Sequence, residues 1–158
     1  MVTIPSITAR GIHEPFYLQV ARGQILEHAT VFKFGFNPDV NSTEETIWDV
    51  GGIYAYPSSA VAMTVTTDAG TPANDNGVKV IVFGLDEDYN EVNQEVTLAG
   101  SGTATTTQTF IRVFRAYVSG SQAPTGNLNI TNGGTTYARI TVEENQTLMA
   151  LWTVPAGY

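Results

Sequence analysis

The stretch VKVIVFGLDEDYNEVNQEVTLAG, Val78 to Gly100, sets the fold class of this chain. Its first residues alternate in side-chain face, so that Val78, Val80 and Val82 share one side of an expected strand. A polar segment rich in Asp and Asn follows, which is the composition of a tight turn, and a second apolar stretch ends at Gly100. The stretch therefore predicts two antiparallel strands joined as a hairpin.

The polar segment of this hairpin is the most charged passage of the chain and is a candidate metal site. Asp86, Asp88 and Asn90 stand at alternate positions, as in the first half of an EF-hand calcium loop. Glu91 occupies the position where such a loop needs Gly, and Thr97 the position where it needs a bidentate Glu. We therefore expect a turn whose Asp and Asn side chains bond their own backbone, with adventitious cation binding as the alternative, and no metal or cofactor site.

Composition extends the β prediction to most of the chain. Of the 158 residues, 42% are apolar and only 14% are charged, against roughly 25% charged in an average soluble protein. Thr is abundant, and β-branched residues favour pleated, half-buried surfaces. Turn residues recur between short alternating stretches, which favours an all-β fold, a β-sandwich with jelly-roll-like topology.

Further strands are expected on both sides of the hairpin. The stretch 60–67 alternates, and a long β-rich run at 105–118 would place Val113 and Ala116 on opposite faces. Gly133 and Gly134 indicate a hairpin turn, and a last strand-like stretch begins at residue 147.

The first fifty residues follow a different pattern. Pro and Gly interrupt their strand-like pieces, and Ser42 with Glu45 offers a capping box for one helical turn. We interpret residues 1–50 as a partly extended N-terminal arm with lead-in strands, and residues 51–158 as the β-sandwich domain. The arm is rich in aromatic residues, which either fill the protein's own core or form an interface.

Charge and cysteine content exclude several function classes. Seven Lys and Arg residues oppose fifteen Asp and Glu, so the formal net charge is −8, and no basic patch suits nucleic acid or an anionic membrane. The chain has no cysteine for disulfides or thiolate metal sites, no signal-peptide pattern and no run of about 18 apolar residues. We expect no nucleic-acid and no membrane partner.

Catalytic constellations are also missing from the sequence. His13 and His28 are the two histidines, no G-x-S-x-G elbow occurs, and the paired glutamates are adjacent, which on a strand directs them to opposite faces. A site built from the two histidines and a neighbouring Glu has no distinctive spacing. We expect no catalytic residues and no enzyme activity.

Four quoted segments resemble capsid decoration (cement) proteins of tailed bacteriophages, a family of small β-sandwich proteins. They are TIWDVGGIYAYPSSA (46–60), VIVFGLDEDYNEVNQEVTLAG (80–100), FIRVFRAYV (110–118) and ENQTLMALWTVPAGY (144–158). The resemblance covers roughly two thirds of the chain in order and spacing. It implies a virion protein on the outer capsid surface, commonly a homotrimer, that bridges adjacent major capsid protein subunits.

Under this reading the arm supplies the contacts with the capsid or with other subunits. The expected contact residues are Arg10, Phe16, Tyr17, Arg22, Phe32, Phe34, Phe36 and Trp48. Core packing of the same aromatics remains the alternative. At the level of function, two alternatives remain: a tail or fibre component that serves as an attachment domain, and a carbohydrate-binding module that stacks sugars on aromatic rings.

Overall fold

The computed structural model describes residues 14–157, so the expectations for Arg10 and His13 lie outside the described residues. The chain divides into two compact units after Phe32, and residues 33–157 form the second unit. The division therefore falls earlier than the arm boundary that we place near residue 50.

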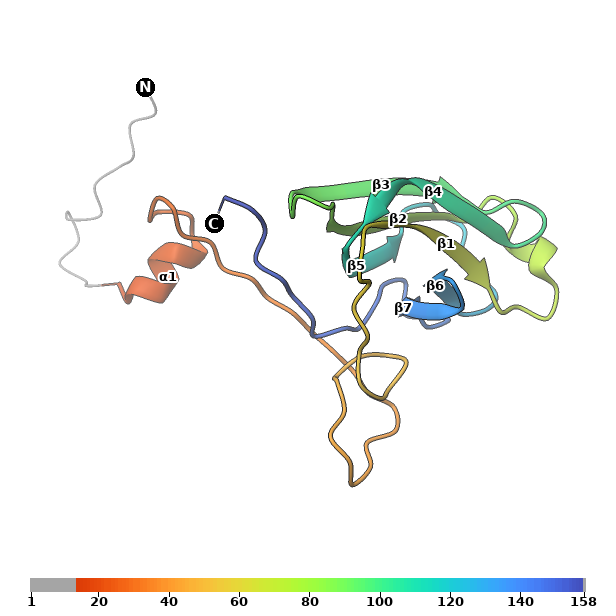
Figure 1. The fold of residues 1–158 in the computed structure, drawn as a ribbon, viewed down its shortest axis with the longest axis horizontal. Helices are drawn as coiled ribbons and strands as arrows, with labels where there is room; N and C mark the ends of the chain where they lie inside the picture. The colour runs from red at the N-terminus through yellow and green to blue at the C-terminus, as the bar shows by residue number, and fades with distance from the viewer. Residues whose placement is uncertain (1–13, 158) are drawn as a thin grey trace. The chain divides into compact units, whose positions relative to one another are not determined.

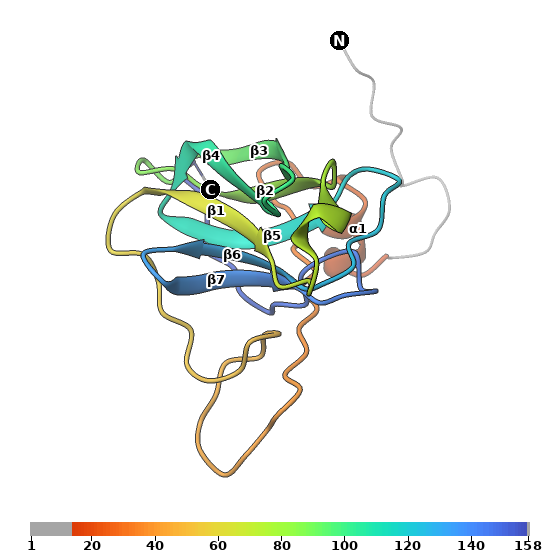
Figure 2. The same cartoon turned by 90° about the vertical axis from the view of Figure 1, so that its right-hand side faces the viewer.

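The second unit is an all-β sandwich, which confirms the predicted fold class. Seven strands form two antiparallel sheets, in the orders β4-β1-β6-β7 and β3-β2-β5 (Figures 1 and 2). The strands are β1 (Val61–Thr67), β2 (Lys79–Leu85), β3 (Glu91–Thr97), β4 (Thr103–Phe110), β5 (Arg112–Val118), β6 (Leu128–Asn132) and β7 (Thr135–Ile140). A short 3₁₀ helix, η2 (Pro72–Asp75), lies between β1 and β2. The jelly-roll-like connectivity stays a prediction.

Alternation in β1 and β2 builds the core as predicted. Met63 and Val65 of β1 and Val80 and Val82 of β2 are fully buried, and they come from opposite sheets. Phe110, at the end of β4, is the largest fully buried side chain. Each such burial stabilises the fold by about 1.5–3 kcal/mol relative to an exposed side chain.

The β-rich run 105–118 is two strands in different sheets. Chain direction changes at Ile111, whose backbone N–H donates to Leu85 O at 2.8 Å. Within β5 the pairing with β2 shifts register, which leaves Phe114 as an extra residue, a β-bulge. Val113 and Ala116 are consequently both buried. The predicted opposite faces are wrong because the extra residue reverses the alternation.

The C-terminal part confirms one prediction and corrects another. Gly133 and Gly134 form the predicted turn between β6 and β7, with φ of +56° and +84°, values that glycine adopts without strain. The strand-like stretch that begins at residue 147 is not a strand. It joins the sheet through an isolated bridge between Tyr117 and Gln146, and its later residues bond to an irregular segment instead of to a strand.

Residues 33–60, which we call the lead-in segment, are irregular throughout and run up to β1. Figures 1 and 2 show this orange-to-gold segment leaving the strands as a long loop and returning to them. The predicted helical turn at Ser42 is absent from it. Glu45 does not act in a capping box, because its carboxylate accepts hydrogen bonds from the side-chain amides of Asn37, at 2.6 Å, and Asn41.

The described part of the first unit contains a short helix, α1 (Phe16–Ala21), where the sequence analysis expects extended chain. Pro15 precedes the helix, and its carbonyl accepts the first helical hydrogen bond from Leu18 N at 3.0 Å. Pro15 is the N-cap residue, outside the helical hydrogen-bond ladder, so its missing N–H removes no bond from the helix. No residue of α1 is buried.

Candidate binding surface

The hairpin tip between β2 and β3 is a turn closed by its own side chains. Asp86 Oδ1 accepts hydrogen bonds from the backbone N–H of Asp88, at 3.0 Å, and of Asn90, at 2.9 Å. These hydrogen bonds, the one from the Asn90 backbone foremost, lower the pKa of Asp86. The predicted self-bonded turn is confirmed. Among residues 14–157, no three His, Cys, Asp or Glu side chains are grouped so that they could hold a metal ion.

Two of the expected contact residues lie on α1, and a third follows it. Phe16 and Tyr17 are more than half exposed. The ring of Phe16 contacts the ring of His28 edge-on, with centroids 5.4 Å apart. Arg22 forms an ion pair with Glu14 at 2.5 Å, although its side chain remains 63% exposed. Within the first unit, these side chains are therefore available for further contacts.

Trp48 has a core position, in line with the alternative reading of the arm aromatics. It is 4% exposed, packs edge-on against Tyr54 with centroids 4.9 Å apart, and donates from Nε1 to Gly52 O at 3.2 Å. Tyr54 is buried as well and donates from its hydroxyl to Tyr137 O at 3.0 Å. Trp48 therefore anchors the lead-in segment to the sandwich and does not lie on its surface.

The remaining expected aromatics are exposed. Phe32 ends the first unit, while Phe34 and Phe36 belong to the lead-in segment. Gly35 separates the latter two and lies over the hydrogen bond from Ala150 N to Ile47 O. A Cβ at Gly35 would lie 2.7 Å from both Ala150 N and Ile47 O. Only glycine lets the backbone approach this closely at that position.

Four apolar side chains of the lead-in segment form what we call the lead-in surface. The exposed fractions are 76% for Phe34, 57% for Phe36, 55% for Ile47 and 67% for Ile53. Their backbones are joined by short contacts. Gly35 lies against Ile47 O, and Thr46 N donates to Gly52 O at 3.0 Å. The backbone between Phe34 and Phe36 therefore lies against the backbone of Ile47, and the backbone before Ile47 bonds to the backbone before Ile53.

The lead-in segment is fixed to the sandwich at its start. Lys33 donates from Nζ to the carbonyl oxygen of Phe114 and lies 5.5 Å from the centre of the Phe114 ring. Phe114 in turn packs against Trp152, with centroids 4.6 Å apart. Burial, together with repulsion from Arg115, lowers the pKa of Lys33 to about 8. The bulged residue of β5 thereby becomes the attachment point of the segment.

Arg112 fixes the end of the lead-in segment, a role that no pattern in the sequence predicts. Its guanidinium lies 4.7 Å from the ring centre of Tyr56 and 5.5 Å from that of Tyr89, which belongs to the hairpin tip. It also donates to Pro57 O at 3.4 Å. Periodicity carries no signal for this cluster, because the three segments come together only in the folded chain.

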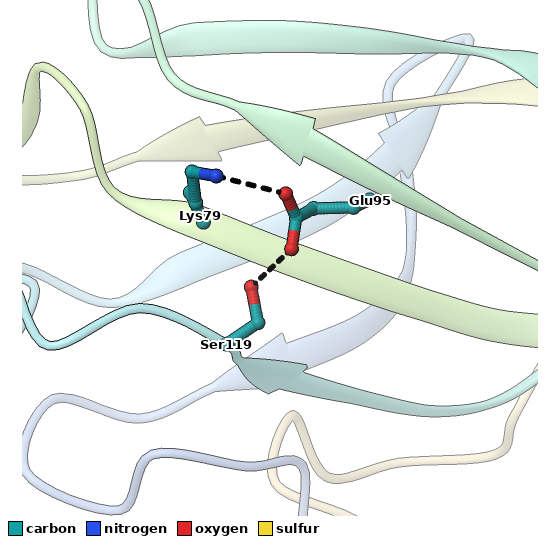
Figure 3. A network of polar contacts seen from close by, with 3 residues as sticks. All are labelled: Lys79, Glu95 and Ser119. Atoms are coloured by element: carbon teal, nitrogen blue, oxygen red, sulfur yellow. Dashed lines mark hydrogen bonds and ion pairs between the residues drawn. The ribbon is translucent and has the colours of Figure 1, made fainter.

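The outer face of the β3-β2-β5 sheet carries a separate polar network (Figure 3). Glu95 accepts from Lys79 Nζ at 3.2 Å and from Ser119 Oγ at 2.8 Å, so one carboxylate links β3, β2 and the residue after β5. These bonds, the one from Ser119 foremost, lower the pKa of Glu95. The network therefore links the three positions through one carboxylate.

The described residues therefore carry exposed apolar side chains on the lead-in segment and no group of three His, Cys, Asp or Glu side chains that could hold a metal ion. None of their helices is long and apolar enough to cross a bilayer. No family model, no curated protein and no solved structure matches this chain.

Proposed function

We propose that the chain is a non-enzymatic structural virion protein of a tailed bacteriophage, which binds the outer capsid surface and bridges adjacent major capsid protein subunits. The lead-in surface carries this proposal: four large apolar side chains, each more than half exposed, on a segment held by buried anchors. Protein interfaces place apolar and aromatic residues at their centre, and a fixed scaffold reduces the entropy lost on binding.

The segments that resemble decoration proteins support the proposal by their places in the fold. Residues 46–60 form the second half of the lead-in segment, and residues 80–100 form the β2–β3 hairpin. Residues 110–118 include β5, to which Lys33 attaches, and the C-terminal stretch carries Ala150. The resemblance thus covers Ile47 and Ile53 of the lead-in surface and the parts that hold it, whereas Phe34 and Phe36 precede the first resembling segment.

We further propose that the protein acts as a homotrimer. Several identical surfaces on one assembly raise the avidity for a repeating lattice without new contacts, by about 10²–10⁴ in favourable geometry. A capsid is such a lattice.

Capsids purified without the protein provide the test. The purified chain should co-sediment with them and raise the temperature at which they break. The double variant F34S/F36S should bind at least about tenfold more weakly, because apolar anchors at interface centres are worth more than 1.4 kcal/mol each. Val142→Ser is the matched control, since Val142 is an exposed apolar residue outside the lead-in surface.

Electron cryomicroscopy of the particles separates capsid attachment from the tail or fibre alternative. Density over the capsid lattice is the expected result. Density confined to the tail, or capsid binding that F34S/F36S leaves unchanged, would overturn the proposal.

A further inference from the structure

Nearly all charged side chains of the lead-in segment are acidic. The segment contains four acidic residues and one basic residue, Lys33. Lys33 Nζ donates to a carbonyl oxygen of the sandwich, and Asp49 is buried. The remaining acidic residues, Asp39, Glu44 and Glu45, are exposed or partly exposed. The charge that the segment presents to solvent is therefore mainly negative.

This charge lies beside the lead-in surface. Asn37 directly follows Phe36, and its side-chain amide donates at 2.6 Å to Glu45, which stands two residues before Ile47. The connection between them, residues 37–46, belongs to the segment that Figures 1 and 2 show extending away from the strands, and we call it the acidic loop. The apolar side chains of the lead-in surface are thus bordered on one side by the acidic loop.

The carboxylates of the acidic loop have no cationic partner among residues 14–157. The ion pairs in that range join Arg22 to Glu14 and Lys79 to Glu95. The Glu45 carboxylate accepts hydrogen bonds from two neutral amides, which hold it in place without cancelling its charge. With three acidic residues and no basic one, the acidic loop has a formal charge of −3 for a partner to neutralise.

We infer that the lead-in surface and the acidic loop together select a partner protein surface on which an apolar patch is bordered by Lys or Arg side chains. Interfaces place apolar residues at their centre and charged residues at their rim, where complementary charge steers the encounter and disfavours wrong partners. The inference rests on the proposed function, under which the partner is the major capsid protein, and it adds the chemistry of the receiving site.

Charge disfavours the chain's own surfaces as this partner. Residues 33–158 contain thirteen acidic and five basic residues, so a second copy approaches with a like net charge, which repels. Residues 14–32 contain a single Lys or Arg, Arg22, and its guanidinium already pairs with Glu14. A separate protein with a basic border fits the acidic loop better than either.

The test measures binding to capsids purified without the protein, from about 0.05 to 0.5 M NaCl, a range in which salt increasingly screens exposed charges. D39N/E44Q removes two charges from the acidic loop and nearly keeps the shape of both side chains. Glu45 is left unchanged because it bonds within the loop. E87Q/D88N is the matched control, since it removes one Glu and one Asp charge from the exposed hairpin tip.

The two parts of the surface should respond differently to salt. At low salt, D39N/E44Q should bind about three- to tenfold more weakly than wild type, mainly through slower association, and the difference should disappear at high salt. E87Q/D88N should bind like wild type. F34S/F36S should bind more weakly at every salt concentration, because apolar contacts are not screened. Equal losses in D39N/E44Q and E87Q/D88N would reduce the effect to net charge and overturn the inference.

A second copy as the partner is tested by light scattering without capsids. F34S/F36S should keep the mass of wild type, whatever that mass is. A lower mass for this variant would assign the lead-in surface to a second copy and overturn the inference.

A resin that carries phenyl and quaternary ammonium groups decides the case in which wild type does not bind capsids. D39N/E44Q should elute from it at lower salt than E87Q/D88N, although the two variants have the same net charge. This result would remove the capsid role and leave the partner chemistry standing, whereas equal elution would overturn both. Capsid binding by wild type that D39N/E44Q leaves unchanged would overturn the inference and leave the proposed function standing.

Discussion

The strands of the sandwich and the lead-in segment use apolar residues in opposite ways. In β1 and β2 every second side chain enters a core formed by both sheets, and the backbone bonds to neighbouring strands. In residues 33–60 a few anchors, among them Lys33 and Trp48, enter the sandwich while phenylalanines and isoleucines remain outside. The strands are thus held in place by a regular ladder of backbone hydrogen bonds, whereas the irregular segment is held in place by individual side-chain anchors.

Two buried aspartates show the same difference in their chemistry. Asp75, in η2, accepts hydrogen bonds from Thr67 Oγ1 at 2.5 Å, Thr125 N at 2.7 Å and Thr125 Oγ1 at 2.8 Å. Asp49, in the lead-in segment, accepts one from Leu148 N at 2.7 Å, and its other oxygen has no hydrogen-bond partner among residues 14–157. Both carboxylate oxygens of Asp75 therefore accept hydrogen bonds, whereas only one carboxylate oxygen of Asp49 does so among the described residues.

The largest expected effect compares two phenylalanines. Phe110→Ala removes a fully buried ring from the core and should lower the free energy of unfolding by about 3–5 kcal/mol. Phe34→Ala removes an exposed ring and should change it by no more than about 0.5 kcal/mol. Urea unfolding of each variant beside wild type, at one protein concentration, measures both values. Equal losses would mean that the lead-in surface is packed in solution.

The second comparison uses pH and the two aspartates. Burial raises the pKa of Asp75, but its hydrogen bonds outweigh this and hold the pKa below its usual value. Its stabilisation is therefore complete above the unfolded pKa of about 4 and is lost as pH falls through the folded value. Asp75→Asn should cost about 1–3 kcal/mol near pH 7 and remove that loss at low pH.

The contribution of Asp49 to the pH dependence of stability should have the opposite sign. Burial raises its pKa, with a further increase from Glu144, while the hydrogen bond from Leu148 N and the charge of Arg139 lower it. Between about pH 4 and the raised value, the folded chain binds more protons than the unfolded chain, so stability rises as pH falls through that window. Asp49→Asn should flatten this part of the profile. Urea unfolding across the pH range checks both variants, and shifts of the same sign would contradict the contrast.

The most local effect separates one anchor from the whole fold. Gly35→Ala places a Cβ against Ala150 N and Ile47 O and should weaken the attachment of the lead-in segment by about 1–3 kcal/mol. Hydrogen exchange should become faster at Phe36 and Ala150, and remain unchanged in β1 and β2. Gly70→Ala is the matched control, because its added Cβ meets no atom within 4 Å. Unchanged exchange at Phe36 would show that the close contact does not hold the segment.

The local alternation of apolar and polar residues predicts those strands whose side chains follow it. Alternation gives the buried faces of β1 and β2, and the Gly133–Gly134 pair gives the β6–β7 turn, because each depends on neighbouring residues alone. The faces of β5 are missed, since the bulge at Phe114 arises from pairing with β2. Exposure of the arm aromatics is likewise set by distant contacts. Trp48 and Phe34 are both aromatic residues of the lead-in segment, yet one is buried and the other exposed.

Arg112 also bears on the order of folding. Its guanidinium requires the hairpin tip at Tyr89, the lead-in segment at Tyr56 and its own strand, positions separated by 23 and more residues in the chain. Contacts between residues distant in sequence form late, because closing the loop between them costs conformational entropy of the chain. We therefore expect the β2–β3 hairpin, whose pairing is local, to form before the lead-in segment closes on it. The exposed phenylalanines of that segment should then acquire a fixed position late.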